Sequence, residues 1–589
     1  MLALFVIVPL VAAALLSLAL GKKPKAIRWV ALSASILSLV IAIYVAMGPQ
    51  GVSRLDWFSI AGYSFGISIA TNPLNAFLLL IVAGITPLIF AYSIGYLDTL
   101  SEQSRFYTEM CIFAAAMMLF AISGNFITMF IAWEMLGITS YLLIGFWYWR
   151  EKAPVAARKA ITTILIGDIM MLMGMLLIWS TYHTFEFAAL ATVADSQALQ
   201  VAMILITLAA FTKSAQFPFH EWLADAMEGP TPVSAFLHSS TMVKAGVFLI
   251  AVLLPVIVAV HLQWLLIIVG IVTALIGATN AIAERHIKRI LAYSTMEDMG
   301  LMFVALGFNA IYAAMLLFLV QAFYKALLFM DAGSIMRINT DKEDIYNVYE
   351  SGARKGVLIS ALIGSASLAG IFPLSGFFGK AAVESVASNA VIYALLLLVE
   401  ILSSFYIFRW LIIPSRKAPL EEDREIVVNA KTMSKWMAAP AYILAIAVVA
   451  SSLAYLYLPR YLLGLTYPVI SITGSIVDTV VVLMGALAAY YVYAKGNRSY
   501  LSSTHPTFHK IMLNSMAVNA VYVYITKAVS LAASAVGSID YAFDKSIYAL
   551  SSMFVKIGDV LKKMETGQTN TYVAAFIIGF VILLLAVVL

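Results

Sequence analysis

Ionisable residues recur inside stretches of this sequence that are otherwise apolar. Twelve of them stand out: Glu134, Asp168, Lys213, His238, Lys244, Glu297, Asp298, Lys325, Asp331, Lys380, Glu384 and Glu400. A charged residue in the centre of a membrane helix costs about 2.5 to 3.5 kcal/mol, so such residues tend to face the protein interior and mark transport pathways. Lysine, histidine and carboxylate side chains are also the groups that pass protons. The pattern therefore predicts a proton path through a membrane.

Eight of these residues form the predicted relay. We expect Glu134 and Lys213 to act as a switch pair, because desolvation favours a neutral amine whereas a nearby carboxylate favours the charged form. His238 is suited to passing protons near neutral pH. The full set of candidate site residues is Glu134, Asp168, Lys213, His238, Lys244, Lys325, Lys380 and Glu384. Static ion pairs that brace helices are the alternative, which explains one pair well but a string of twelve residues poorly.

Lys380 is expected to be the carrier at the exit of this path. Glu384 lies one helical turn further along the same face and is expected to hold the proton until release. The alternative is that Lys380 simply pairs with Glu384.

The composition is that of an all-α polytopic membrane protein. Of 589 residues, 63% are hydrophobic and 11% are charged, whereas soluble domains carry about 25% charged residues. The net charge of +5 arises from bases in short loops, so no nucleic-acid partner is expected. Cys111 is the single cysteine, so this chain alone cannot build a disulfide or a cysteine-ligated cluster. We assign no metal site and no cofactor-binding residue, and any redox chemistry is expected on partner chains.

Hydropathy predicts about sixteen transmembrane helices, separated by loops of unequal charge. They lie near residues 2–20, 28–46, 72–96, 107–122, 124–148, 159–181, 197–216, 230–256, 262–284, 288–308, 309–335, 357–389 (interrupted), 391–412, 437–458, 473–494 and 570–589. Loops on one side are rich in lysine and arginine, whereas the opposite loops hold little beyond Arg54 and Arg460. The positive-inside rule assigns the basic loops to the cytoplasm and both termini to the outside.

Residues 514–565 differ from the spans because their apolar residues alternate with lysines and aspartates. We expect a long lateral helix on the cytoplasmic face, about 75 Å long at 1.5 Å per residue. Another membrane span is the alternative, which would export Lys556, Lys562 and Lys563.

Two predicted spans are interrupted by proline near a lysine. Lys213 precedes Pro218, and Pro373 precedes Lys380. Broken helices at matching places suggest an internal repeat around a polar pathway. The predicted domains are 1–106 (N-terminal helices), 107–256 (first repeat), 257–412 (second repeat), 413–511 (additional helices), 512–566 (lateral amphipathic helix) and 567–589 (C-terminal helix).

Several motifs resemble the antiporter-like subunits of respiratory complex I, of Mrp-type cation/proton antiporters and of membrane-bound hydrogenases. They are Lys213 with Phe217-Pro218-Phe219-His220-Glu221-Trp222; Glu228-Gly229-Pro230-Thr231-Pro232-Val233-Ser234-Ala235; Ile287-Lys288-Arg289-Ile290-Leu291-Ala292-Tyr293-Ser294-Thr295; Phe323-Tyr324-Lys325-Ala326-Leu327; and Gly376-Phe377-Phe378-Gly379-Lys380. The chain looks similar to the distal complex I subunit that carries the lateral helix. Gln321, in place of a histidine, and the pair Glu297 and Asp298 depart from the family pattern.

The resemblance implies a fold of two inverted five-helix repeats. It also implies a proton-translocating subunit of a complex I-type oxidoreductase in a prokaryotic cell membrane. By this resemblance Glu134 and Lys213 match the family's switch pair, His238 and Lys325 its central relay, and Lys380 its terminal lysine. Flavin, iron–sulfur clusters and quinone are expected in partner subunits, together with other antiporter-like membrane subunits. The alternative is a cation/proton antiporter subunit that exchanges sodium for protons, or an ion-pumping hydrogenase subunit.

Overall fold

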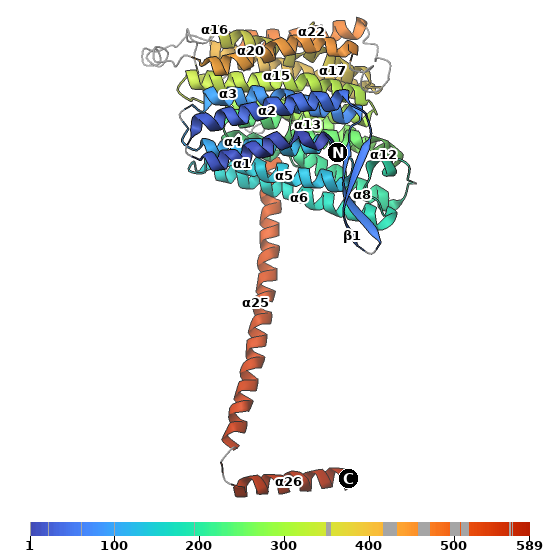
Figure 1. The fold of residues 1–589 in the computed structure, drawn as a ribbon, viewed down its shortest axis with the longest axis vertical. Helices are drawn as coiled ribbons and strands as arrows, with labels where there is room; N and C mark the ends of the chain where they lie inside the picture. Colours follow the sequence, from blue (N-terminus) through green and yellow to red (C-terminus); the bar gives the residue numbers. More distant parts are fainter. Residues whose placement is uncertain are drawn as a thin grey trace. The chain divides into compact units, whose positions relative to one another are not determined.

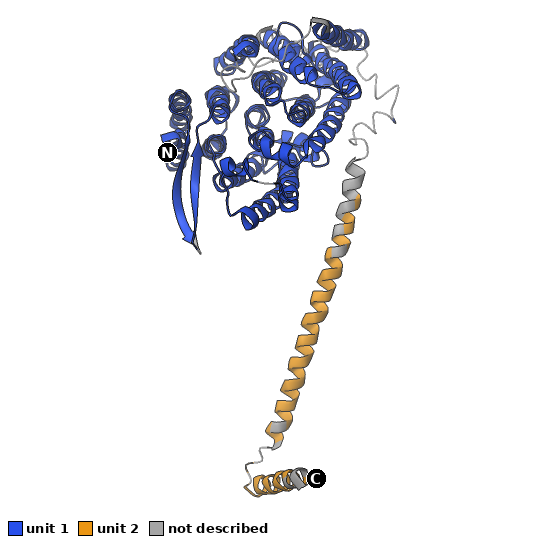
Figure 2. Ribbon diagram, turned by 90° about the vertical axis from the view of Figure 1, so that its right-hand side faces the viewer, with its two compact units in different colours: residues 1–516 blue, residues 517–589 orange. Residues whose placement is uncertain are grey.

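The computed structural model describes residues 2–588 apart from 22, 61, 99, 194, 349–354, 416–432, 458–471, 495–506, 508–517, 565–566 and 568. The chain divides into two units, Met1–Met516 and Ala517–Leu589 (Figure 2). The described part of the first unit is a bundle of helices with one β-hairpin, and that of the second unit is two helices (Figure 1). The all-α class predicted from the sequence is confirmed.

The first part of the bundle runs from the N-terminus to residue 259. Its elements are η1 (Leu2–Val6), α1 (Val8–Leu20), α2 (Pro24–Met47), β1 (Val52–Ile60), β2 (Tyr63–Ala70), α3 (Pro73–Tyr96), α4 (Gln103–Ala121), α5 (Phe126–Ile144), α6 (Lys152–Tyr182), α7 (Phe187–Leu190), α8 (Gln197–Lys213), α9 (Glu221–Asp225), η2 (Ala226–Glu228), α10 (Thr231–Ser239), α11 (Met242–Val252) and α12 (Leu254–Ala259).

The second part of the bundle continues to residue 493. Its elements are α13 (Gln263–Ala283), α14 (Ile287–Gly307), α15 (Ile311–Ile338), η3 (Ile345–Asn347), α16 (Lys355–Ala369), α17 (Ser375–Ser385), α18 (Ala390–Ile412), η5 (Ile413–Ser415), α20 (Lys435–Ala450), η6 (Ser451–Leu453) and α22 (Ile472–Tyr493). The second unit holds α25 (Val518–Met564) and α26 (Thr569–Val588).

Twelve helical segments among the described residues are long and apolar enough to cross a membrane, and three shorter apolar helices accompany them. Each predicted span falls on a helix, but the count of sixteen and the inverted repeats stay predictions. The span predicted at 230–256 corresponds to the candidate span Thr231–Val252, whose helix is interrupted at Ser240 and Thr241 between α10 and α11. Arg460 and residues 514–517 and 565 lie outside the described part of the chain.

The lateral segment is one helix, α25, of 47 residues, which corresponds to about 70 Å at 1.5 Å per residue. Its single uninterrupted course agrees with the helix predicted there. Which face of the membrane it follows stays a prediction.

Local sequence signals set several helix ends. The side chains of Asn72, Asn125 and Ser196 accept hydrogen bonds from the backbone N–H groups of Asn75, Thr128 and Leu199 at the starts of α3, α5 and α8. Such caps satisfy N–H groups that have no partner within the helix, which matters most where water is scarce.

Burial is uneven across the bundle and identifies its core. The apolar windows of the span formed by α10 and α11 and of α14 are 94% buried, and that of α15 is 89% buried, whereas those of α1 and α2 are only 33% and 28% buried. The most buried spans are therefore the ones that carry His238, Lys244, Glu297, Asp298 and Lys325, and α1 and α2 leave most of their apolar surface exposed.

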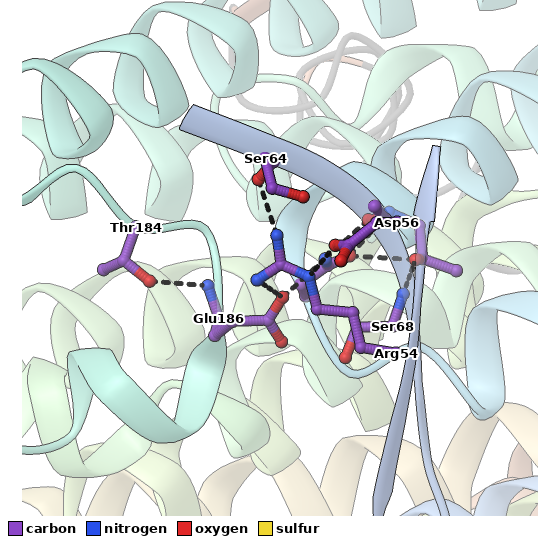
Figure 3. Close-up of polar contacts among 9 residues, drawn as sticks. Arg54, Asp56, Ser64, Ser68, Thr184 and Glu186 are labelled. Carbon is purple, nitrogen blue, oxygen red and sulfur yellow. Dashed lines mark hydrogen bonds and ion pairs between the residues drawn. The ribbon is translucent and has the colours of Figure 1, made fainter. Parts of the chain in front are cut away.

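The β-hairpin was not predicted from the sequence. Strands β1 and β2 pair antiparallel, with a bulge between Asp56 and Phe58. Figure 3 shows Arg54 reaching the backbone carbonyl of Ser64, Asp56 at 2.9 Å and Glu186 at 3.5 Å. A hydrogen bond from the Ser64 side chain lowers the pKa of Asp56. These contacts tie the hairpin to the segment that follows α6.

Candidate functional site

Lys213 is the last residue of α8 and is fully buried. Its Nζ lies 3.8 Å from Oδ1 of Asp168 on α6 and donates a 2.5 Å hydrogen bond to the carbonyl of Trp133 on α5. The indole Nε1 of Trp133 donates to the same Asp168 oxygen at 2.6 Å. The ammonium also lies 4.2 Å from the centre of the Trp133 ring. One lysine, one carboxylate and one indole thus form a closed cluster away from water.

Glu134 was expected to be the partner of Lys213, but the ion pair in the structure is with Asp168. Glu134 is half-buried and has no ion pair within 4 Å among the described residues. It is still close enough for its charge to act on Lys213. The Lys213 amine therefore has Asp168 within ion-pair distance, while Glu134 acts on it from further away.

His238 and Lys244 occupy the two sides of the break between α10 and α11. Neither imidazole nitrogen of His238 has a hydrogen-bond partner among the described residues, and its ring stacks on Phe329 with centroids 5.4 Å apart. Lys244 Nζ donates to the carbonyl of Phe318 at 2.7 Å, and it forms no ion pair among the described residues. Both side chains are buried, and neither has an ion-pair partner within the described part of the chain.

Two adjacent carboxylates on α14 connect two lysines from different helices. Asp298 Oδ2 lies 3.0 Å from Lys325 Nζ on α15, and Glu297 Oε1 lies 3.6 Å from Lys380 Nζ on α17. Each lysine also donates a 2.5 Å hydrogen bond, Lys325 to Ser294 and Lys380 to Ser403. Two adjacent acids of α14 therefore each contact one buried lysine, Asp298 that of α15 and Glu297 that of α17.

Lys380 does not form its ion pair with Glu384, so that alternative from the sequence is wrong. The carboxylates of Glu384, Glu400 and Asp478 gather instead, with oxygens within 4.8 Å of one another. All three are buried, and Glu384 and Glu400 line a cavity of about 10 Å³ together with Lys380. Three ionised carboxylates this close in a dry site repel strongly, so such clusters retain protons.

Asp478 on α22 was missed by the sequence analysis. It is the only Asp, Glu, Lys or Arg in the 22 residues of Ile472–Tyr493. The same rule on intramembrane charges that identified the other residues would have found it. Glu297, Asp298 and Glu400 were noted but were not placed among the eight site residues, and the structure brings them into direct contact with those residues.

These observations define a multi-pass membrane protein whose bundle holds buried clusters of acids and bases, one at Lys213 and Asp168 and another at Lys325, Asp298, Glu297 and Lys380. Residues 123–405 match the family described as "NADH:quinone oxidoreductase/Mrp antiporter, TM", and residues 57–107 match "NADH-Ubiquinone oxidoreductase (complex I), chain 5 N-terminus". The chain belongs to this family of antiporter-like membrane subunits. Asp478 lies outside both matched ranges.

Individual relatives differ in how much of the chain they match. The NADH-quinone oxidoreductase subunit L of Campylobacter jejuni is 31% identical over 94% of this chain and 93% of its own length. The chloroplastic NAD(P)H-quinone oxidoreductase subunit 5 of Ipomoea purpurea is 36% identical over 65% of this chain, and the match spans 58% of that relative. A chain in the structure of the Mrp complex from Dietzia sp. shares the fold, with a TM-score of 0.76 and 23% identity over 100% of this chain and 63% of that chain.

Proposed function

We propose that this chain is a proton-translocating membrane subunit of a complex I-type oxidoreductase. The observation that carries the proposal is the buried line of acids and bases from Asp168 and Lys213, through Lys325 and Asp298, to Glu297 and Lys380. A purely bracing role would not need two lysines bridged by adjacent acids in the driest part of the bundle. The relatives named as quinone oxidoreductase subunits support the same conclusion.

The first step of the proposed relay is a change of partner by Lys213. With Asp168 near, the amine is held charged, and a shift toward Glu134 or away from both acids releases its proton. The carbonyl of Trp133 accepts from the amine and holds the lysine in position. Breaking or making this contact is the local event that couples helix movement to protonation.

The centre of the relay is formed by His238, Lys244 and Lys325. Neither nitrogen of His238 has a hydrogen-bond partner among the described residues, so the ring can accept a proton, but the positive charge of Lys325 opposes this until Lys325 has given up its own proton. Asp298 acts on both Lys325 and Lys244. A proton that reaches Asp298 is one residue away from Glu297, the partner of Lys380.

The end of the relay is Lys380 with its four surrounding carboxylates. Glu297 delivers the proton to the amine, and the group of Glu384, Glu400 and Asp478 receives it. Moving one charge against 100 mV costs about 2.3 kcal/mol, which corresponds to less than about two units of pKa at about 1.4 kcal/mol per unit. Coupled buried pairs supply changes of that size.

Electron transfer and its cofactors, flavin, iron–sulfur clusters and quinone, belong to other subunits in this proposal. The chain lies in a prokaryotic cell membrane beside other antiporter-like subunits. Both termini face outward, and α25 follows the cytoplasmic face, where its lysines stay in contact with water.

Asp298→Asn tests the proposal at the bridge between the two lysines. The complex is reconstituted in vesicles, and proton uptake is followed with a pH-sensitive dye during electron transfer. We expect uptake to fall by about tenfold or more, the usual scale for losing a proton-transfer group. Asp195→Asn, in the loop before α8, is the matched control and should pump normally. Normal pumping by Asp298→Asn in an assembled complex would remove the bridge from the mechanism.

A cation/proton antiporter subunit is the second candidate, because the fold match to the Mrp complex extends over the whole chain. The complex is purified, its flavin, iron and nickel are measured, and quinone reduction is assayed with NADH. Redox centres and redox-driven uptake support the first candidate. Their absence, with sodium-driven proton movement, would assign the chain to the antiporters.

A further inference from the structure

A cavity of about 340 Å³ lies at one end of the bundle, apart from the proposed relay. It is formed by the end of α3, the loop between α5 and α6, the start of α14 and the end of α15 with its following loop. Its lining includes the charged residues Arg150, Lys288, Arg337, Asp341 and Glu343. Arg337 already forms an ion pair with Asp98. The other charged residues of the cavity take no part in the proposed proton relay.

The two other bases of the cavity, Arg150 and Lys288, form no ion pair within 4 Å among the described residues, although the charge of Glu343 acts on both from a longer distance. Arg150 is exposed, stacks on Trp147 at 5.3 Å from the ring centre, and forms no ion pair among the described residues. Lys288 is 3% exposed, and its Nζ donates to the carbonyls of Met227 at 2.5 Å and Gly229 at 2.9 Å. An ammonium has three donors, so one remains. A buried lysine bonded only to neutral carbonyls gains from an anion placed in the cavity.

The acids of the cavity are of two kinds. Glu343 is held by His286, with 3.2 Å between carboxylate and imidazole, and the hydrogen bond from His286 lowers the pKa of Glu343 to about 2. Asp341 is exposed and has no ion pair among the described residues. A simple anion would meet repulsion from both carboxylates. A ligand that carries a negative and a positive charge a few bonds apart meets the complementary charge at each end.

Two aromatic residues of the lining indicate where this ligand comes from. Trp147 and Trp149 line the cavity, and tryptophan is enriched where membrane helices reach the level of the lipid head groups. Basic pockets between membrane helices on the cytoplasmic side bind lipid head groups. The loops around Arg150 and Lys288 are the ones that the sequence assigns to the cytoplasm.

We propose that this cavity binds the head group of a zwitterionic phospholipid with a primary amine, such as phosphatidylethanolamine. The phosphate lies between Arg150 and Lys288, and the ammonium donates to Asp341. Such a lipid would fix the loop between α5 and α6 against the ends of α3 and α15. When no lipid is bound, Arg150 and Asp341 are free to form an ion pair with each other.

The test uses the purified complex in micelles holding equal amounts of phosphatidylethanolamine, phosphatidylcholine and phosphatidylglycerol. Lipids retained after washing are counted by native mass spectrometry. We expect phosphatidylethanolamine to be retained preferentially, and Arg150→Gln and Asp341→Asn each to lower its binding at this site by about fivefold, the effect of losing roughly 1 kcal/mol of binding energy. Lys152→Gln, an exposed base two residues from Arg150, is the control and should retain the lipid fully.

Three outcomes would overturn the proposal. Equal retention by wild type and Arg150→Gln would show that the cavity is not the site. Equal retention of phosphatidylglycerol and phosphatidylethanolamine would exclude the role of Asp341. Displacement of the lipid by millimolar inorganic phosphate would assign the site to free phosphate. Because Arg150 and Asp341 are both exposed, the variants should assemble normally, and none of these results bears on proton pumping.

Discussion

Lys213 and Lys380 both lie beside a helix break, yet their surroundings differ. Lys213 ends α8 before the break, where the helix C-terminus favours a positive charge. Lys380 lies in the second turn of α17, after its break, where no such end effect helps. The two lysines therefore do not occupy equivalent positions about their breaks.

The number of nearby acids compensates for this difference. Lys213 has one carboxylate within ion-pair distance, whereas Lys380 contacts Glu297 and shares a small cavity with Glu384 and Glu400, next to Asp478. A lysine with one partner is easily released when that partner moves. A lysine among several acids stays charged until protons arrive on the acids. The comparison suggests a switch at one end of the line and a proton store at the other.

The largest difference between the two lysines is expected when each is replaced by methionine. Lys380→Met removes the ion-pair partner of Glu297 and the cation beside Glu384 and Glu400, and breaking a buried pair costs about 3 to 5 kcal/mol. We expect Lys380→Met to lower both the yield of assembled complex and pumping, and Lys213→Met to abolish pumping with near-normal assembly. Pumping in vesicles and the thermal stability of the complex measure the two effects. Equal destabilisation by both variants would contradict the comparison.

Replacement of each lysine by arginine tests whether that lysine gives up its proton. Arg keeps its positive charge throughout the accessible pH range, so a static ion pair would tolerate the change and a proton carrier would not. We expect Lys213→Arg and Lys380→Arg each to lower pumping by about tenfold in an assembled complex. Lys152→Arg, which is exposed, is the control. Near-normal pumping by Lys380→Arg would remove its role as the carrier.

Sequence patterns predicted the helices of the bundle well because apolar length and helix breaks are local properties. The break at Pro218, the break at Pro373 and the long helix α25 all follow from residues within a few turns. The ion-pair partners of the two lysines could not be predicted from the sequence. Lys213 pairs with Asp168, 45 residues away in the sequence, and Lys380 pairs with Glu297, 83 residues away, and such contacts depend on tertiary packing. The hairpin was missed because an exposed two-stranded ribbon leaves little hydropathy signal.

Asp478→Asn sharpens the comparison at the proton store. The change removes one of three clustered charges but leaves Lys380 and Glu297 paired, so we expect pumping to fall only about two- to fivefold, less than for a group in direct transfer. Stability should be unchanged or slightly higher because repulsion is relieved. Proton uptake and the melting temperature are measured together. Asp168→Asn removes the one acid that lies within ion-pair distance of Lys213 among the described residues, so it should lower pumping more than Asp478→Asn. If Asp478→Asn lowered pumping more, the acid cluster beside Lys380 would matter more than the partner of Lys213.

Among these substitutions, the smallest effect is expected at the ion pair between Glu343 and His286, which lies in the loops outside the predicted spans. Glu343 pairs with His286 at 3.2 Å, its side chain is 42% exposed, and its pKa is lowered to about 2. A carboxyl whose pKa is lower in the folded state stabilises the fold above its unfolded pKa, about 4.5, and loses this contribution as the pH falls toward 2. Water screens such a pair, so Glu343→Gln should cost less than about 1 kcal/mol at neutral pH. Melting temperatures of the wild-type complex and the variant should differ slightly at neutral pH and converge in acid. A gap that stays constant or widens below about pH 4 would show that Glu343 acts through something other than its charge.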